Sequence, residues 1–323
     1  MSNRTMLHQR PRVIFFGMQS NFSLPVLTAL LQSNIQVCAV VLHIVPVSGR
    51  EAPVIERKEP SRSVRHALPL INAAFQPSIL QLAWSQRIPV WEVHRLGHAD
   101  VIATLAAYQP DIICLACFPQ RIPHSIIELP RLGCLNVHPS LLPSNRGPVP
   151  LFWTFRQADE TTGVTVHLIN DEMDAGDMLA QEPVQVAEGI SYAQLELQCA
   201  QRGGQLLAQS IWELYRGEAT RTPQDEAKGS YHSFPVHEDF VLHVETCSAR
   251  HVYNFIRAAG HWDEPIELHA NGEVLLVRDA LSYSLYKDVH DERKDGRSEQ
   301  GDDGTWVRCK DGWVRVVFPL HLS

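Results

Sequence analysis

The 323-residue chain lacks several features that would place it in a specialised class of protein. No run of apolar residues approaches the ~20 needed to cross a bilayer, so we expect no membrane partner. The apolar run at 13–16 that follows the basic N-terminus is too short for a signal peptide. Lys and Arg number 28 against 36 Asp and Glu, a net charge of -8, which argues against non-specific coating of nucleic acid.

Signatures of metal and nucleotide sites are also missing or incomplete. The 16 histidines show no HExxH and no paired-ligand spacing, which disfavours a metal site. Cys114 and Cys117 form a CxxC, but within one strand they would point to opposite faces, so we interpret them as buried, inert thiols. Only Gly17 of a GxGxxG loop is present, so the backbone could not approach a pyrophosphate closely. Seven thinly spread cysteines indicate reduced thiols and a cytoplasmic protein.

The first 140 residues alternate apolar strands with helices. Strands apolar on both faces are expected at 13–16, 36–42, 88–91, 111–117 and 133–137, and helices at 24–31, 78–87 and 99–108. This alternation predicts an α/β fold with a doubly wound, mostly parallel sheet. Between 43 and 77 the pattern lapses into a polar, basic loop that includes Arg50. Long loops in compact domains are usually functional or disordered.

The second half becomes richer in short strands. Strands are expected at 165–169 and 178–186, before a long helix over 191–215. The polar stretch 216–230 contains Pro and Gly and is interpreted as a linker. We therefore expect a catalytic domain over 1–215 and a smaller domain over 231–323. Further short strands and one helix predict an OB-like β-barrel in the smaller domain, with the helix at 249–259 and strands at 267–269, 274–277, 305–308 and 313–318.

The most informative segment lies between residues 133 and 177. Asn136 and His138 close a buried strand at the carboxyl edge of the predicted sheet, where α/β proteins bind ligands. Strand alternation directs both side chains to the same face. An amide and an imidazole therefore lie side by side, although a satisfied structural histidine would look the same.

Two further motifs follow this strand. Arg146 and Gly147 belong to a stiff loop that also contains two prolines. Asp174 is one of four acidic residues in the turn 171–177, which by itself could be a solvated acidic turn. Neither motif identifies a function when it is taken alone.

Together the motifs resemble the family of formyltransferases that use N10-formyltetrahydrofolate. The resemblance rests on Asn-x-His-Pro-Ser-Leu-Leu-Pro at 136–143, Arg-Gly at 146–147, Thr-Gly-Val-Thr at 162–165 and Met-Asp-Ala-Gly-Asp at 173–177. It is strong over 110–186, fair over the first strands and weak in the C-terminal part. Within the family, the chain most resembles the members that formylate methionyl-tRNA.

The resemblance implies that Asn136, His138 and Asp174 are catalytic. Formyl transfer to a primary amine requires that the amine lose a proton and that the formyl oxygen carry negative charge. Asn136 can donate a hydrogen bond to that oxygen. His138, with an ordinary pKa of about 6.5, can donate to the same oxygen or shuttle the proton. Asp174 can orient the imidazole or accept the amine proton; this chemistry requires neither a metal nor a covalent enzyme intermediate.

The resemblance also implies residues and partners for binding. Residues expected to bind the folate co-substrate, N10-formyltetrahydrofolate, are Phe118, Gln120, Arg121, Ile122, Ser140, Leu141, Asn170 and Asp171. Residues expected to bind the acceptor are Arg50, Arg146 and Gly147. Initiator tRNA is the expected macromolecular partner, and we expect a monomer or weak dimer.

Three hypotheses remain open for the reaction. The first is formylation of methionyl-tRNA, favoured by the two-domain length and the basic loop. The second is N-formylation of a small amine such as a nucleotide-linked amino sugar. It is favoured because Ser144-Asn145 replaces the Arg-Trp usual in the family, and because residues 231–323 hold ten Lys and Arg against sixteen Asp and Glu. The third is folate binding without transfer, or hydrolysis that releases formate.

Overall fold

The computed structural model describes residues 10–43, 53–60, 78–270, 272–285, 300–301 and 304–318. The chain divides into two compact units. The first comprises Met1–Arg146, Gly163–Pro183 and Leu197–Ser230, and the second Gly147–Thr162, Val184–Glu196 and Tyr231–Ser323. The stretch 216–230 thus groups with the first unit, and two internal segments group with the C-terminal region. The domain limits at 215 and 231 stay a prediction.

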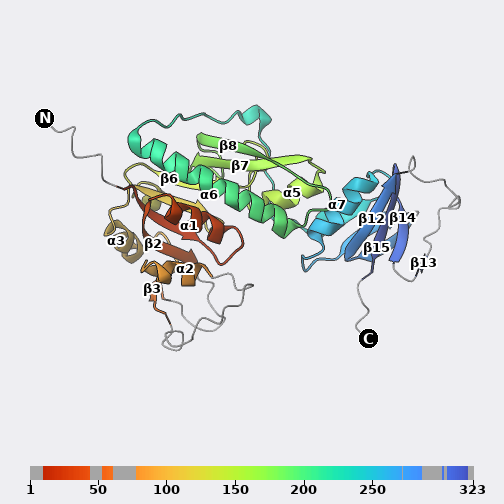
Figure 1. Cartoon of the computed structure of the whole chain (residues 1–323), viewed down its shortest axis with the longest axis horizontal. Coiled ribbons are helices and arrows are strands. Elements are labelled where there is room, and N and C mark those ends of the chain that lie inside the picture. Colours follow the sequence, from red (N-terminus) through yellow and green to blue (C-terminus); the bar gives the residue numbers. More distant parts are fainter. Residues whose placement is uncertain are drawn as a thin grey trace. The chain divides into compact units, whose positions relative to one another are not determined.

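An eight-stranded sheet, in the order β3-β4-β2-β1-β5-β6-β7-β8, organises the fold (Figure 1). Its strands are β1 (Arg12–Gly17), β2 (Gln36–His43), β3 (Ile55–Lys58), β4 (Val90–Val93), β5 (Ile112–Ala116), β6 (Cys134–His138), β7 (Thr161–Leu168) and β8 (Met178–Gln185). Parallel pairing joins β4, β2, β1, β5 and β6, while β3 pairs antiparallel with β4 and β7 pairs antiparallel with β6. The predicted α/β fold with a mostly parallel sheet is confirmed.

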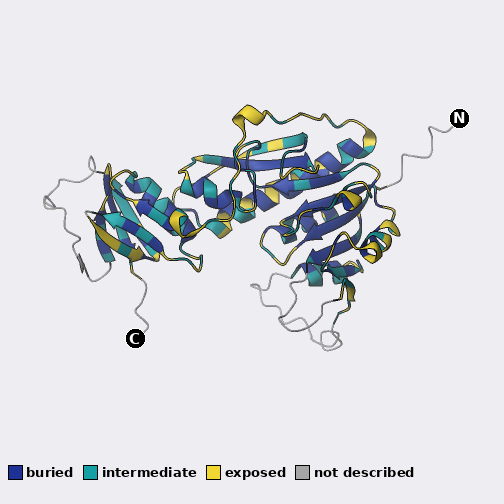
Figure 2. Ribbon diagram, turned by 180° about the vertical axis from the view of Figure 1, so that it is seen from behind, coloured by how far each residue is buried: buried dark blue, intermediate teal, exposed yellow. Residues whose placement is uncertain are grey.

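Helices cover the apolar strands of the sheet. The helices are α1 (Ser23–Gln32), α2 (Ile79–Ser85), α3 (Ala99–Ala106), α4 (His124–Ile127) and α6 (Tyr192–Arg216). Ile14 and Phe16 of β1 and Ile113 of β5 are fully buried, and the central strands are the darkest part of the sheet in Figure 2. Strands covered on both faces must be apolar throughout, which explains why they could be recognised in the sequence.

Two glycines in α6 allow this helix to pack closely on β6, which carries the predicted site, and on α1 (Figure 1). A Cβ on Gly203 would lie 2.5 Å from Val137 Cγ1 in β6. A Cβ on Gly204 would lie 2.8 Å from Ala29 Cβ in α1. Both distances are too short for a real contact, so the backbone of α6 approaches more closely than any larger residue would permit.

Two local predictions were wrong. The polar loop expected over 43–77 contains β3, which pairs with β4; its single apolar residue, Ile55, packs on the core, too weak a periodic signal to predict a strand. Cys117 is exposed rather than buried, because β5 ends at Ala116 and Cys117 takes a left-handed φ of 55°. Burial raises the pKa of Cys114, the other cysteine of the pair, well above its usual value.

The second unit contains the small β region predicted for the C-terminal part. Its elements are α5 (Pro150–Arg156), β9 (Val241–His243), α7 (Ala249–Ala259), β10 (Ile266–Ala270), β11 (Glu273–Val277), β12 (Asp279–Leu285), β13 (Gln300–Gly301), β14 (Gly304–Arg308) and β15 (Gly312–Val317). The strands form two sheets, β11-β10-β9 and β12-β15-β14-β13. Closure of these sheets into a barrel stays a prediction. Phe152 of α5, a helix that we did not predict, packs its ring 5.1 Å from Phe240 and 5.7 Å from Phe255.

Among the residues that the structure describes, no helix is long and apolar enough to span a membrane. All seven cysteines lie within those residues, and none of them forms a disulfide.

Candidate active site

Strand β6 carries the amide and the imidazole that the sequence singled out. It pairs parallel with β5 and antiparallel with β7, in a register that places Asn136 opposite His167 and His138 opposite Thr165. His138 is 4% exposed. The antiparallel pairing is decisive, because it brings a second histidine beside Asn136.

Asp174 comes from the turn between β7 and β8. Its φ of 52° lies in the left-handed region, which Asp tolerates better than most residues. The turn folds back tightly, because a Cβ on Gly176 would lie 1.9 Å from the Leu168 carbonyl oxygen, and the Leu168 N–H donates to the Asp177 carbonyl at 2.9 Å. Only glycine permits that approach, and the result is an Asp174 side chain directed back to the end of β6.

The structure brings Asn136, His138 and Asp174 together. Asp174 Oδ2 lies 3.7 Å from His138 Nδ1, and Asp174 Oδ1 lies 3.4 Å from Asn136 Nδ2. The His138 and Asp174 side chains are 5% and 10% exposed. Asn136 and His138 both face the same carboxylate, as strand alternation predicts.

The hydrogen bonds of His138 fix its tautomer. Its Nε2 lies 2.8 Å from the Asn145 carbonyl oxygen, which can only accept, so we assign the hydrogen to Nε2. In the neutral ring, Nδ1 is therefore the basic nitrogen, and it faces Asp174. Burial lowers the pKa of His138 most strongly, and the nearby His167 lowers it further; the Asp174 carboxylate and the Asn145 carbonyl oppose this change.

His167 is a site residue that the sequence analysis missed. Its Nδ1 donates to the Leu168 carbonyl at 2.9 Å, so its Nε2 is free to accept a hydrogen bond from Asn136 Nδ2 at 3.2 Å. The same Nε2 lies 3.6 Å from Asp174 Oδ1. His167 thus orients the Asn136 amide. The alternation of β7 could have indicated it, had the register of β7 against β6 been known.

The two loops expected to hold the folate lie together. Arg121 donates to the Asp171 carbonyl, and His124 Nδ1 lies 3.4 Å from an Asp171 carboxylate oxygen. Gln120 donates to the His94 carbonyl at 3.0 Å, and His94 Nδ1 is buried without a hydrogen-bond partner.

Apolar and polar groups alternate along the same loops. Phe118 packs its ring 5.1 Å from Phe16, and Ile122 is buried. Asn170 Oδ1 accepts from the Glu172 N–H at 3.0 Å. Folate binding by these loops stays a prediction.

Ser140 and Leu141 make structural contacts. Ser140 Oγ donates to the Ser144 carbonyl at 2.7 Å, and its own carbonyl accepts from Thr165 at 2.7 Å. Leu141 packs under Gly163, where a Cβ would lie 2.3 Å from Leu141 Cδ2. Folate binding by these two residues stays a prediction.

The three residues expected to bind the acceptor have different settings in the structure. Arg146 bonds through its guanidinium to Gln224 and Glu226. Gly147, with a φ of 117°, belongs to the second unit, and Arg50 lies outside the described residues. Acceptor binding by these three residues stays a prediction.

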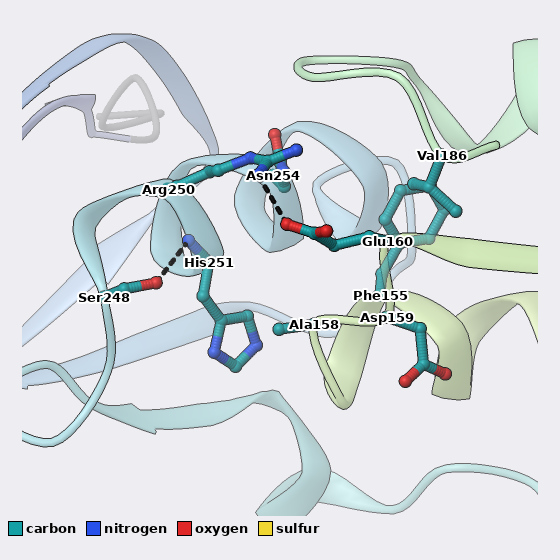
Figure 3. A pocket seen from close by; sticks show the side chains of 9 residues that line it. All are labelled: Phe155, Ala158, Asp159, Glu160, Val186, Ser248, Arg250, His251 and Asn254. Carbon is teal, nitrogen blue, oxygen red and sulfur yellow. Dashed lines mark hydrogen bonds and ion pairs between the residues drawn. The ribbon is translucent and has the colours of Figure 1, made fainter.

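A separate hollow of about 90 Å³ lies within the second unit (Figure 3). It is lined at the start of α7 by Arg250 and His251, and Arg250 pairs with Glu160 at 2.7 Å. None of the predicted site residues lines it. Across the described parts of the chain, no group of three or more His, Cys, Asp or Glu side chains could hold a metal ion.

Comparison with known proteins gives this geometry a context. The model of the formyl transferase family matches residues 11–211. A methionyl-tRNA formyltransferase from Synechococcus sp. (strain JA-3-3Ab) is 34% identical over 250 residues, which are 76% of this chain and 71% of that protein.

Solved structures share the fold at lower identity. WlaRD, a sugar 3N-formyl transferase crystallised in the presence of dTDP and 5-N-formyl-THF, has a TM-score of 0.61 and 16% identity over 98% of this chain and 100% of its own. HypX from Aquifex aeolicus, in complex with tetrahydrofolic acid, has a TM-score of 0.56 and 17% identity over 95% of this chain and 44% of its own.

Proposed function

The chain belongs to the formyl transferase family, and on that basis we propose that it transfers a formyl group from N10-formyltetrahydrofolate to the amino group of methionyl-tRNA. It is a formyl-transferring enzyme. The observation that carries the proposed chemistry is the convergence of the Asn136 amide and the His138 imidazole on the Asp174 carboxylate, at 3.4 and 3.7 Å.

Each side chain has one task in this scheme. N10-formyltetrahydrofolate supplies the formyl group. Asn136 donates a hydrogen bond to the formyl oxygen as that oxygen gains negative charge; its bond to Asp174 is long at 3.4 Å and is readily exchanged for a stronger acceptor.

His138 then acts as the base. Because burial keeps its pKa low, the ring is neutral near pH 7, and Nδ1 can take the proton of the attacking amine and return it to N10 as the bond between N10 and the formyl carbon breaks. Asp174, 3.7 Å from Nδ1, stabilises the imidazolium that forms.

The folate is proposed to bind against the loops that contain Phe118 and Asp171. Support comes from their mutual contacts and from the buried, unpaired nitrogen of His94. Seven cysteines without a disulfide among the described residues support our further proposal of a cytoplasmic enzyme, for which we expect a monomer or weak dimer.

Labelled formyl transfer tests the acceptor. The protein is incubated with N10-formyltetrahydrofolate labelled in the formyl group, and with methionyl-tRNA, a dTDP-linked amino sugar or no acceptor. We expect label in formylmethionine after deacylation of the tRNA. Label only in the sugar would show that the amino sugar, and not methionyl-tRNA, is the acceptor. Label only in free formate would contradict formyl transfer to an amine.

The amino-sugar acceptor is kept as a second candidate for one reason. Arg146, in the family's Arg-Gly motif, has its guanidinium bonded to Gln224 and Glu226 and is therefore engaged away from any tRNA phosphate. A smaller acceptor would not need it.

A further inference from the structure

The segment from Thr222 to Ser230 runs beside the turn that carries Asp174 and beside the loop before Arg146. Thr222 and Met178 exchange both backbone hydrogen bonds at 2.9 Å. Ser230 accepts from the Asn145 N–H through its hydroxyl at 2.8 Å and from the Arg146 N–H through its carbonyl at 2.9 Å. The segment is thus fixed at both ends, and Gln224 lies between them.

The Gln224 amide has every hydrogen-bonding position filled. Its Nε2 donates to the carbonyl oxygens of Asp174 and Gly176, each at 2.8 Å. Its Oε1 accepts from Arg146 Nε at 3.0 Å and Nη2 at 2.8 Å. The two N–H bonds of the amide donate to two carbonyl oxygens, and its oxygen accepts twice from one guanidinium. The orientation of this amide is therefore unambiguous.

We propose that Gln224 is a positioning residue that holds the backbone of the Asp174 turn so that the Asp174 carboxylate faces His138. This role rests on the proposed function, in which Asp174 stabilises the charged imidazole. Gln224 reaches Asp174 through its backbone carbonyl.

The conformation of the turn gains from support by a neighbouring segment. Asp174 keeps a left-handed φ of 52°, a region that is unfavourable for residues other than glycine. Met173 is 50% exposed, so the outer side of the turn packs against little. A single amide that binds both the Asp174 and the Gly176 carbonyls fixes the peptide planes that follow these two residues.

Arg146 takes a second role in the same arrangement. Its side chain is 10% exposed, and Glu226 accepts from Nη1 and Nη2 at 2.9 Å each. The guanidinium therefore polarises the side-chain carbonyl of Gln224 on one side, and Glu226 neutralises the charge of the guanidinium on the other. A hydrogen bond to a charged group is about twice as strong as a neutral one, which anchors Gln224 firmly.

Gln224→Met tests the role, because it keeps the length of the side chain and adds no charge. Gln201→Met on the exposed face of α6 is the matched control. We expect kcat for formyl transfer to fall about 10- to 100-fold in Gln224→Met, with little change in the KM for formyl-folate and none in the control.

Titration of His138 by NMR supplies a readout that does not depend on turnover. The groups that face this imidazole are the Asp174 carboxylate, the His167 ring and the Asn145 carbonyl. Loss of the fixed carboxylate should lower the pKa of His138 in Gln224→Met. If the wild type transfers no formyl group but this pKa still falls, positioning stands and the proposed function fails.

A second variant protects the test against misfolding. Gln224→Glu keeps the Arg146 contact but turns an oxygen toward the two carbonyls, so kcat should again fall at an unchanged thermal unfolding midpoint. Wild-type kcat in either folded variant, or an unchanged pKa of His138 in Gln224→Met, would overturn the proposal.

Discussion

Asp174→Asn removes the charge at the centre of the site while keeping the shape of the side chain. Asp174 Oδ2 lies 3.7 Å from His138 Nδ1, and both side chains are at least nine-tenths buried, so solvent screens the pair little. At an effective dielectric constant of ~20, opposite charges at this distance attract by about 4 kcal/mol. At about 1.4 kcal/mol per tenfold change, that attraction corresponds to nearly three orders of magnitude.

We therefore expect Asp174→Asn to lower kcat by about 10²- to 10³-fold. Rapid-quench measurement of formylmethionine at saturating formyl-folate gives the rate of the transfer step. Asp100→Asn, on an exposed carboxylate of α3, is the control for loss of one negative charge. A transfer rate within a few-fold of wild type would refute the view that this carboxylate stabilises the protonated imidazole.

Three other outcomes follow from the same structure. Asn136→Ala should lower kcat by ~10²–10³-fold through loss of one donor; unchanged single-turnover rates would exclude that role. Because burial lowers the pKa of His138, kcat/KM should rise with pH along an acid limb centred below about 6.5, and Asp174→Asn should move that limb to lower pH. Because the pKa of His138 is lower in the folded chain than in the unfolded chain, the unfolded chain binds a proton at His138 first as the pH falls. The contribution of His138 to the free energy of unfolding is therefore present above about pH 6.5 and diminishes below it. Gly203→Leu should lower the free energy of unfolding by about 1–3 kcal/mol, seen as a lower urea midpoint, because even a Cβ there would lie 2.5 Å from Val137.

The sequence predicted the sheet and the strand that carries the site because both depend on local patterns. Buried parallel strands are apolar on both faces, so β1, β2 and β5 could be recognised without any knowledge of their partners. Strand alternation was enough to place Asn136 and His138 on one face, where both reach Asp174. The choice of Asp174 among four acidic residues depended on family resemblance.

The missed residues depend on long-range geometry. His167 reaches Asn136 only through the antiparallel register of β7 against β6, and a shift of one residue would turn it away. Gln224 lies 50 positions from Asp174 in a stretch whose Pro and Gly content indicates only a linker. Exposed Cys117 depends on where β5 ends, and strand limits are poorly encoded in local sequence.

A crystal structure with a stable formyl-folate analogue tests the central claim most directly. The account predicts the formyl oxygen within about 3.5 Å of Asn136 Nδ2, with His138 Nδ1 open to the side from which the amine approaches. A formyl group bound away from Asn136, His138 and Asp174, with these side chains still closed on one another, would contradict it.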